Sequence, residues 1–72
     1  MRQERYTVIA DATGSEYSWH YTLDKASRVA DKYAAEDGGV YRVDLAVMEG
    51  NPRDGFECID ADPDLYSTEV RS

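Results

Sequence analysis

The sequence predicts an α+β fold, a four-stranded antiparallel sheet with one helix packed on one face and the elements in ββαββ order. Two stretches, residues 16–22 and 40–48, alternate along the chain with the period of a half-buried strand. Residues 23–37 instead repeat apolar side chains at spacings of three and four, as an amphipathic helix does. A length of 72 residues suffices for one such domain and is too short for two.

The first hairpin is predicted from two strand-like runs joined by a short loop. Arg5 to Asp11 is β-branched and aromatic at its centre, and residues 12–15 supply the glycine and small polar residues of a turn. The second run places Ser18, His20 and Thr22 on one face and the aromatic residues on the other. We expect that aromatic face to be core, formed by Tyr17, Trp19 and Tyr21.

The helix is predicted to begin near Leu23, because the Thr22 hydroxyl can accept a backbone N–H of the first turn. The pair Gly38-Gly39 ends it, since glycine takes a positive φ without steric cost. Its packed face is predicted to comprise Leu23, Ala26, Val29, Ala30 and Tyr33.

The second hairpin follows the helix. Residues 40–48 alternate, with Tyr41, Val43, Leu45 and Val47 on one side, and the turn formers of residues 49–55 lead into a shorter strand over residues 56–61. Because Pro63 interrupts a ladder, residues 62–72 are predicted to be an acidic polar tail with one helical turn around residues 64–67. The predicted organisation is therefore an α+β domain over residues 1–61 followed by that tail.

One helix covers only one face of such a sheet, so the other face meets solvent or a partner. Exposure is ordinary for antiparallel sheets, and a homodimer across this face is the alternative. The uncovered face is predicted to carry Ser18, His20, Arg42, Asp44, Met48, Glu57 and Ile59.

Charge restricts the partners. The net charge is -7, which disfavours direct binding to nucleic acid, and no apolar run is long enough to span a bilayer. Residues 44–72 contain eight acids and only two bases, whereas residues 1–43 are nearly balanced. With no apolar leader at the start and a single cysteine, Cys58, which cannot close an internal disulfide, the sequence predicts a cytoplasmic protein.

Few residues suit catalysis or metal binding. His20 and Cys58 each occur once, so zinc lacks ligands, and Cys58 shares a strand side with Phe56, which suggests a small buried hydrophobe. The string from Asp60 to Asp64 begins like a calcium loop but lacks the later glycine and glutamate. No phosphate-binding glycine motif is present. We expect no enzyme activity, no cofactor and no metal.

The acidic second half is the best candidate for a site. Two interpretations stay open, a solvated face that keeps the chain soluble or a patch that binds a basic surface of another protein. Tyr66 could anchor such a patch or close the edge of the core. The candidate partner-binding residues are Glu49, Asp54, Glu57, Asp60, Asp62, Asp64 and Tyr66.

In size, acidic excess, sheet-and-helix pattern and lack of catalytic motifs, the chain resembles the small acidic inhibitor proteins encoded by phages, of the anti-CRISPR or DNA-mimic type. The resemblance covers no diagnostic motif, so it assigns no residue. It implies steric, stoichiometric inhibition of a nucleic-acid-handling protein through that protein's basic surface. The nearly neutral first half favours a local patch over an extended duplex mimic. The alternative is a homodimeric structural or regulatory accessory protein without catalytic activity.

Overall fold

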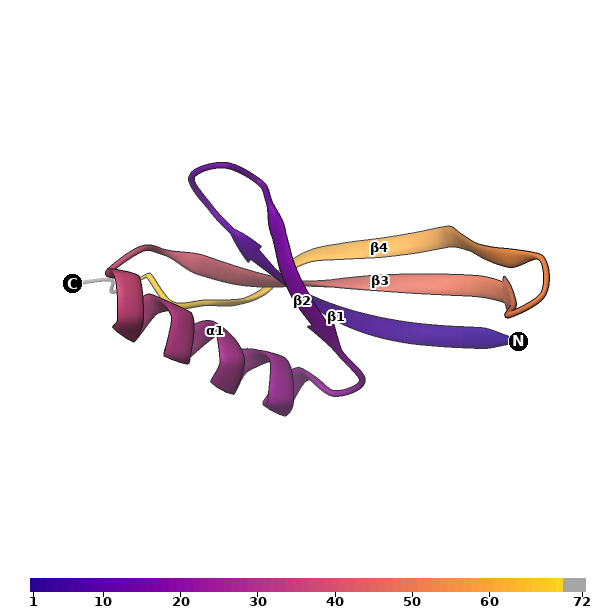
Figure 1. Cartoon of the computed structure of the whole chain (residues 1–72), viewed down its shortest axis with the longest axis horizontal. Helices are drawn as coiled ribbons and strands as arrows, with labels where there is room; N and C mark the ends of the chain where they lie inside the picture. The colour runs from indigo at the N-terminus through magenta and orange to yellow at the C-terminus, as the bar shows by residue number, and fades with distance from the viewer. Residues whose placement is uncertain (70–72) are drawn as a thin grey trace.

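The computed structural model describes residues 1–69 and confirms the α+β fold. The elements are β1 (Arg2–Ala10), β2 (Glu16–His20), α1 (Leu23–Asp37), β3 (Tyr41–Asn51) and β4 (Gly55–Ser67). All neighbouring strands pair antiparallel in the order β2-β1-β3-β4, so the β1–β3 pair joins the two hairpins at the centre of one sheet (Figure 1).

Helix α1 has the predicted ends. The Thr22 side chain accepts a hydrogen bond from the Lys25 backbone N–H at 3.2 Å, which satisfies one of the free donors of the first turn. Gly38 adopts the left-handed conformation with a φ of 74°, and its N–H donates to the Ala34 carbonyl. Both local signals therefore determine the length of the helix as expected.

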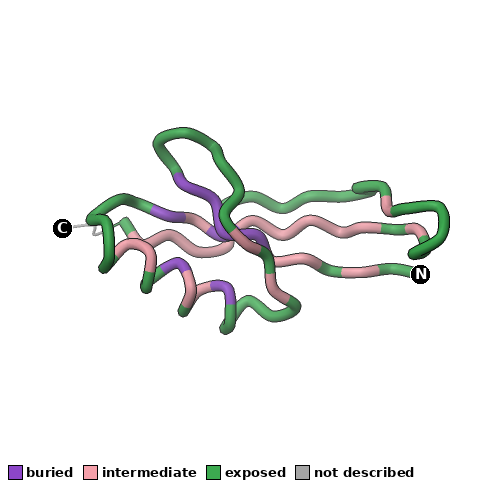
Figure 2. Tube along the Cα trace, in the orientation of Figure 1, coloured by how far each residue is buried: buried purple, intermediate pink, exposed green. Residues whose placement is uncertain are grey.

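The core lies where α1 crosses β1 and β3. Val8 and Val43 are paired in the β1–β3 ladder and are fully buried, and Ala26 and Ala30 pack against them from the helix. Tyr41 closes this core near the end of α1, where its hydroxyl donates to the Asp37 carboxylate. Figure 2 shows that the buried segments gather at this crossing and along the inner side of the helix.

The expectation that Tyr17, Trp19 and Tyr21 share a core face is wrong. The register between β1 and β2 shifts because Val8 pairs with Ser18 while Ile9 pairs with Glu16, which leaves Tyr17 without a partner on β1. Trp19 pairs with Thr7 on the face opposite the helix, and it is 41% exposed. Tyr17 instead makes edge contacts with two aromatic rings on the helix side, those of Tyr33 and Tyr41.

The fourth strand is longer than predicted. β4 continues through residues 62–67, so these residues are not a polar tail and form no helical turn. Pro63 is compatible with the strand because β4 lies at the edge of the sheet and because the ladder is irregular beside it, between the pairs Leu45–Asp62 and Val43–Tyr66. The last three residues of the predicted tail, 70–72, lie outside the described residues.

The two faces of the sheet are called the helix side and the far face. Arg42, Asp44 and Met48 lie on the far face, as predicted. The prediction is wrong for three residues that pair with helix-side positions, namely Ser18 with Val8, His20 with Tyr6 and Glu57 with Glu49. Ile59 falls in a second irregularity of β4 and has no partner on β3. Cys58 pairs with Met48 on the far face and is exposed, so the expectation that it is buried is also wrong.

The sheet extends well beyond the helix. The molecule measures 43 × 22 × 20 Å, and Figure 1 shows the outer part of the β3–β4 hairpin and the start of β1 projecting past α1. In Figure 2 the projecting part contains no buried segment. Both faces of this outer sheet are therefore uncovered.

Candidate partner-binding surface

Five carboxylates lie together on the helix side of the projecting sheet, beyond the N-terminal end of α1 (Figure 1), and we call them the acidic face. They occupy three successive rows of the ladder, since paired residues of neighbouring strands point to the same side. The rows are Arg2–Glu49–Glu57, Glu4–Val47–Asp60 and Tyr6–Leu45–Asp62. The acidic face thus comprises Glu4, Glu49, Glu57, Asp60 and Asp62, with Arg2 as the base in these rows.

All five side chains of the acidic face belong to exposed residues. The ion pairs formed within residues 1–69 lie elsewhere: Arg28 pairs with Asp24 on the helix, and Arg42 pairs with two other carboxylates. In that part of the chain no acidic-face residue belongs to an ion pair. Like charges that face each other across a ladder destabilise a sheet, and an opposite charge supplied from outside relieves this repulsion.

The backbone of β4 explains how its acids reach this surface. Asp60 and Glu57 are three residues apart, a spacing that would place them on opposite faces of a regular strand. The irregularity at Ile59 restores them to one face, so that Asp60 pairs with Val47 and Glu57 pairs with Glu49. Half-buried Val47 lies between Glu4 of β1 and Asp60 of β4, and half-buried Leu45 lies beside Asp62, so the two side chains give the surface an apolar strip.

Four of the seven predicted binding residues belong to the acidic face: Glu49, Glu57, Asp60 and Asp62. Asp54 lies in the turn at the tip of the same hairpin, where its carboxylate accepts from the Asn51 side chain at 3.1 Å and its own N–H donates back to Asn51. Asp54 therefore stabilises the turn and is adjacent to the acidic face rather than part of it.

Asp64 and Tyr66 lie apart from the acidic face, at the other end of β4. The Asp64 N–H donates to the Asp44 carboxylate at 2.9 Å. The Tyr66 ring packs against the core, and its hydroxyl donates to Asp31 on α1 at 2.6 Å, a bond that raises the pKa of Tyr66. Tyr66 therefore closes the edge of the core, which is the second of the two roles considered for it.

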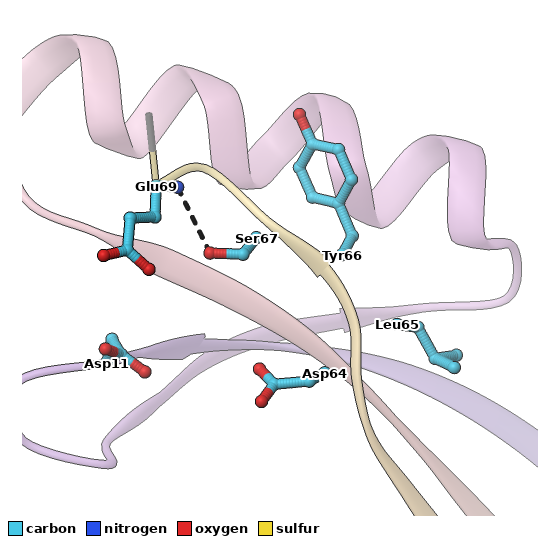
Figure 3. Close-up of a pocket in the computed structure, with 6 residues that line it drawn as sticks. All are labelled: Asp11, Asp64, Leu65, Tyr66, Ser67 and Glu69. Atoms are coloured by element: carbon cyan, nitrogen blue, oxygen red, sulfur yellow. Dashed lines mark hydrogen bonds between the residues drawn. The ribbon is translucent and has the colours of Figure 1, made fainter. Parts of the chain in front are cut away.

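A half-open pocket of about 520 Å³ lies beside this end of β4 (Figure 3). Its acids are Asp11, Asp64 and Glu69, and Figure 3 shows the Tyr66 hydroxyl directed away from them toward α1. Asp11 is paired with Arg42 at 3.1 Å, and this hydrogen bond raises the pKa of Arg42. The charge of the pocket is thus partly neutralised by the protein itself.

His20 and Cys58 are the single histidine and the single cysteine of the chain. The Ser18 hydroxyl lies 3.1 Å from His20 Nε2, two residues along the same strand. Within residues 1–69, no three His, Cys, Asp or Glu side chains are grouped so as to hold a metal ion. The structure of those residues also contains no helix with the length and apolar character needed to cross a bilayer.

Sequence reasoning missed Glu4, which joins the acidic face from the otherwise balanced half of the chain. The alternation of β1 could have indicated it, since Glu4, Tyr6 and Val8 are two residues apart in turn and therefore face the same side of the sheet, the helix side. The pairing of Glu4 with Val47 across the β1–β3 ladder has no counterpart in local sequence patterns.

Comparisons with known proteins give no further guidance, because no family model, curated protein or solved structure matches the chain.

Proposed function

We propose that the protein is a small cytoplasmic binding protein that uses the acidic face to occupy the basic, nucleic-acid-binding surface of another protein. The observation that carries the proposal is the grouping of five exposed carboxylates, without ion-pair partners among residues 1–69, on a part of the helix side that lies beyond α1. The expected action is that of a stoichiometric inhibitor of the anti-CRISPR or DNA-mimic kind, without catalysis.

The spacing of the acids supports this mode of binding. Neighbouring strands lie about 4.8 Å apart and alternate residues of one strand about 6.6 Å apart, so the acidic face spans about 10 × 13 Å. Successive phosphates of one nucleic-acid strand are separated by a comparable distance of about 6–7 Å. This distance exceeds the axial rise of about 3.4 Å per nucleotide because the strand winds around the helix axis. A basic groove that accepts a few phosphates can therefore contact several of these carboxylates at once.

The apolar strip supports affinity as well as encounter. Opposed charges raise the association rate but contribute little net affinity when they stay exposed, whereas apolar side chains that become desolvated hold a complex together. Leu45 and Val47 are half-buried in the free protein and are adjacent to the acids in the ladder. A partner that covers the acidic face buries these two side chains further.

The test is affinity capture from cell lysate on two variants with the same change in net charge. Asp60→Asn with Asp62→Asn alters the acidic face, and Asp24→Asn with Glu36→Gln removes two exposed acids of α1 as the matched control. We expect wild type and the control to retain a nucleic-acid-binding protein that is released as salt is raised above about 0.15 M. The acidic-face variant should capture much less of it.

The captured protein is then titrated with the wild type while its binding to labelled nucleic acid is followed by fluorescence anisotropy. Displacement of the nucleic acid at one-to-one stoichiometry supports the proposal. The proposal fails if the two variants lose capture equally, if retention does not respond to salt, or if the partner binds nucleic acid and this protein simultaneously.

A further inference from the structure

The outer part of the far face is the open surface that differs most in character from the acidic face. Nearer the β1–β2 loop, Thr7 and Ile9 lie on the same face and are buried. Arg5 lies over the Trp19 ring, with its guanidinium carbon 4.6 Å from the ring centroid, and it is 5.2 Å from the ring of Phe56. Met48 and Cys58 form the next pair of the ladder beside this group. A shallow hollow of about 200 Å³ lies among Arg5, Trp19, Met48 and Cys58. Aromatic and sulfur-containing side chains thus surround an open depression.

The core on the other side is small for a chain of this length. Among residues 1–69 the fully buried side chains are no larger than valine, and the core cluster otherwise relies on alanines and Tyr41. The indole of Trp19, the largest apolar group of the chain, is 41% exposed on the far face. Small domains bury a low fraction of their surface, so a second layer on this face would add apolar burial that the single chain lacks.

Charge indicates which partner fits this face. A net charge of -7 makes two copies of the chain repel each other over most orientations. Two copies that meet through their far faces repel each other less, because their acidic faces then lie on the outer sides of the pair. The far-face carboxylate of Asp44 is also paired with Arg42, at 3.3 Å. Arg5 and the exposed Glu16 both border the hollow. Because one base and one acid border the same hollow, a twofold axis there would set unlike charges of the two copies near each other.

The area that a dimer needs is a modest fraction of the protein surface. A stable interface of ordinary size buries about 800 Å² on each partner, which is roughly one sixth of the 5033 Å² surface of this chain. Packing of two such faces leaves both acidic faces on the outside of the pair.

From these observations we propose that the far face is covered by a second copy of this chain, forming a twofold-symmetric dimer in which two sheets stack with Trp19, Met48 and Cys58 at the interface. The dimer is independent of the function proposed above, since it uses the opposite side of the sheet. It would present two acidic faces per particle.

The test uses sedimentation equilibrium of the full chain under reducing conditions, from about 1 μM to about 1 mM protein. Met48→Lys places a charge in the interface of each copy. Val47→Lys is the matched control, since it introduces the same charge at the adjacent residue of β3 on the opposite face, and both residues are half-buried. Cys58→Lys is a second interface variant at an exposed edge-strand position, which tolerates lysine without loss of folding. Circular dichroism checks the fold of each variant.

We expect the wild type and Val47→Lys to dimerise, and both interface variants to weaken the dimer by at least about tenfold. A wild type that stays monomeric at the highest concentration overturns the proposal. So does a dimer that persists in Cys58→Lys, because pairing must then use the free edge of β4 or another surface. Loss of folding in Met48→Lys leaves Cys58→Lys to decide. None of these outcomes depends on whether a partner binds the acidic face.

Discussion

Glu49 and Glu57 face each other directly in the β3–β4 ladder, and this pair gives the sharpest test of the acidic face. Directly paired side chains have their Cβ atoms about 5 Å apart, and two unit charges at that distance in water repel by roughly 0.8 kcal/mol. Because the carboxylates are exposed and can turn apart, we expect about 0.5 kcal/mol of the repulsion to persist at low salt. Glu57→Gln should therefore raise the free energy of unfolding by about 0.5 kcal/mol.

Glu49 has a second neighbour, Arg2, which pairs with it from β1. Removal of the Glu49 charge relieves the repulsion from Glu57 but also removes the attraction to Arg2, so Glu49→Gln should leave stability nearly unchanged. The double variant isolates the coupling between the two carboxylates, since it subtracts the effects that each substitution has on its other neighbours.

The assay is urea denaturation of wild type, both single variants and the double variant at one protein concentration, followed by the fluorescence of Trp19, the single tryptophan. Urea carries no charge, so the salt concentration can be varied separately. The coupling should shrink toward zero at about 1 M salt, where the Debye length falls to about 3 Å. A coupling of zero at low salt, or one that does not change with salt, would refute the placement of these two acids side by side.

Three further predictions concern the fold. Val43→Ala removes two methyl groups from a fully buried position and should lower the free energy of unfolding by about 2 kcal/mol, seen as a lower urea midpoint with an unchanged slope. Tyr66→Phe deletes the hydrogen bond to Asp31 and should cost about 1 kcal/mol by the same assay, whereas a smaller loss than about 0.3 kcal/mol would show that this bond does not hold β4 to the helix. The pKa of Asp37 lies below its ordinary value, mainly because the Tyr41 hydroxyl donates a hydrogen bond to its carboxylate. The ionised Asp37 therefore stabilises the fold above about pH 4, and this stabilisation is lost as the pH falls through the pKa of the folded state. Asp37→Asn should thus lower the melting temperature at pH 7 and have little effect at pH 2, and an equal effect at both would contradict the assignment.

Local signals in the sequence were sufficient for most of the fold. The ends of α1 follow from Thr22 and Gly38, whose roles depend only on their neighbours in the chain. The strict alternation of β3 placed Val43 and Met48 on the correct faces, because the β1–β3 ladder is regular and the extra residues of the β3–β4 ladder lie in β4. Element order and helix length could therefore be predicted without knowledge of the pairing.

The remaining features depend on contacts between strands. An irregular step at residue 17 reverses the relation between Tyr17 and Trp19, and period-two alternation has no means of showing it. Pro63 argued against a strand, yet at an edge its missing N–H costs nothing when it faces away from the ladder. For the site, the acidic half of the chain was evident, but Glu4 joins it only through the β1–β3 register.

The projection of the β3–β4 hairpin beyond α1 has a consequence for the motions of the protein. Its outer residues have no buried neighbours, so the tip can open while the core around Val8 and Val43 stays closed. Amide hydrogen exchange should show two levels of protection, with fast exchange beyond Val47 and slow exchange near the core. A partner bound at the acidic face would slow exchange at the tip, so part of the binding free energy would be spent on ordering the surface that binds.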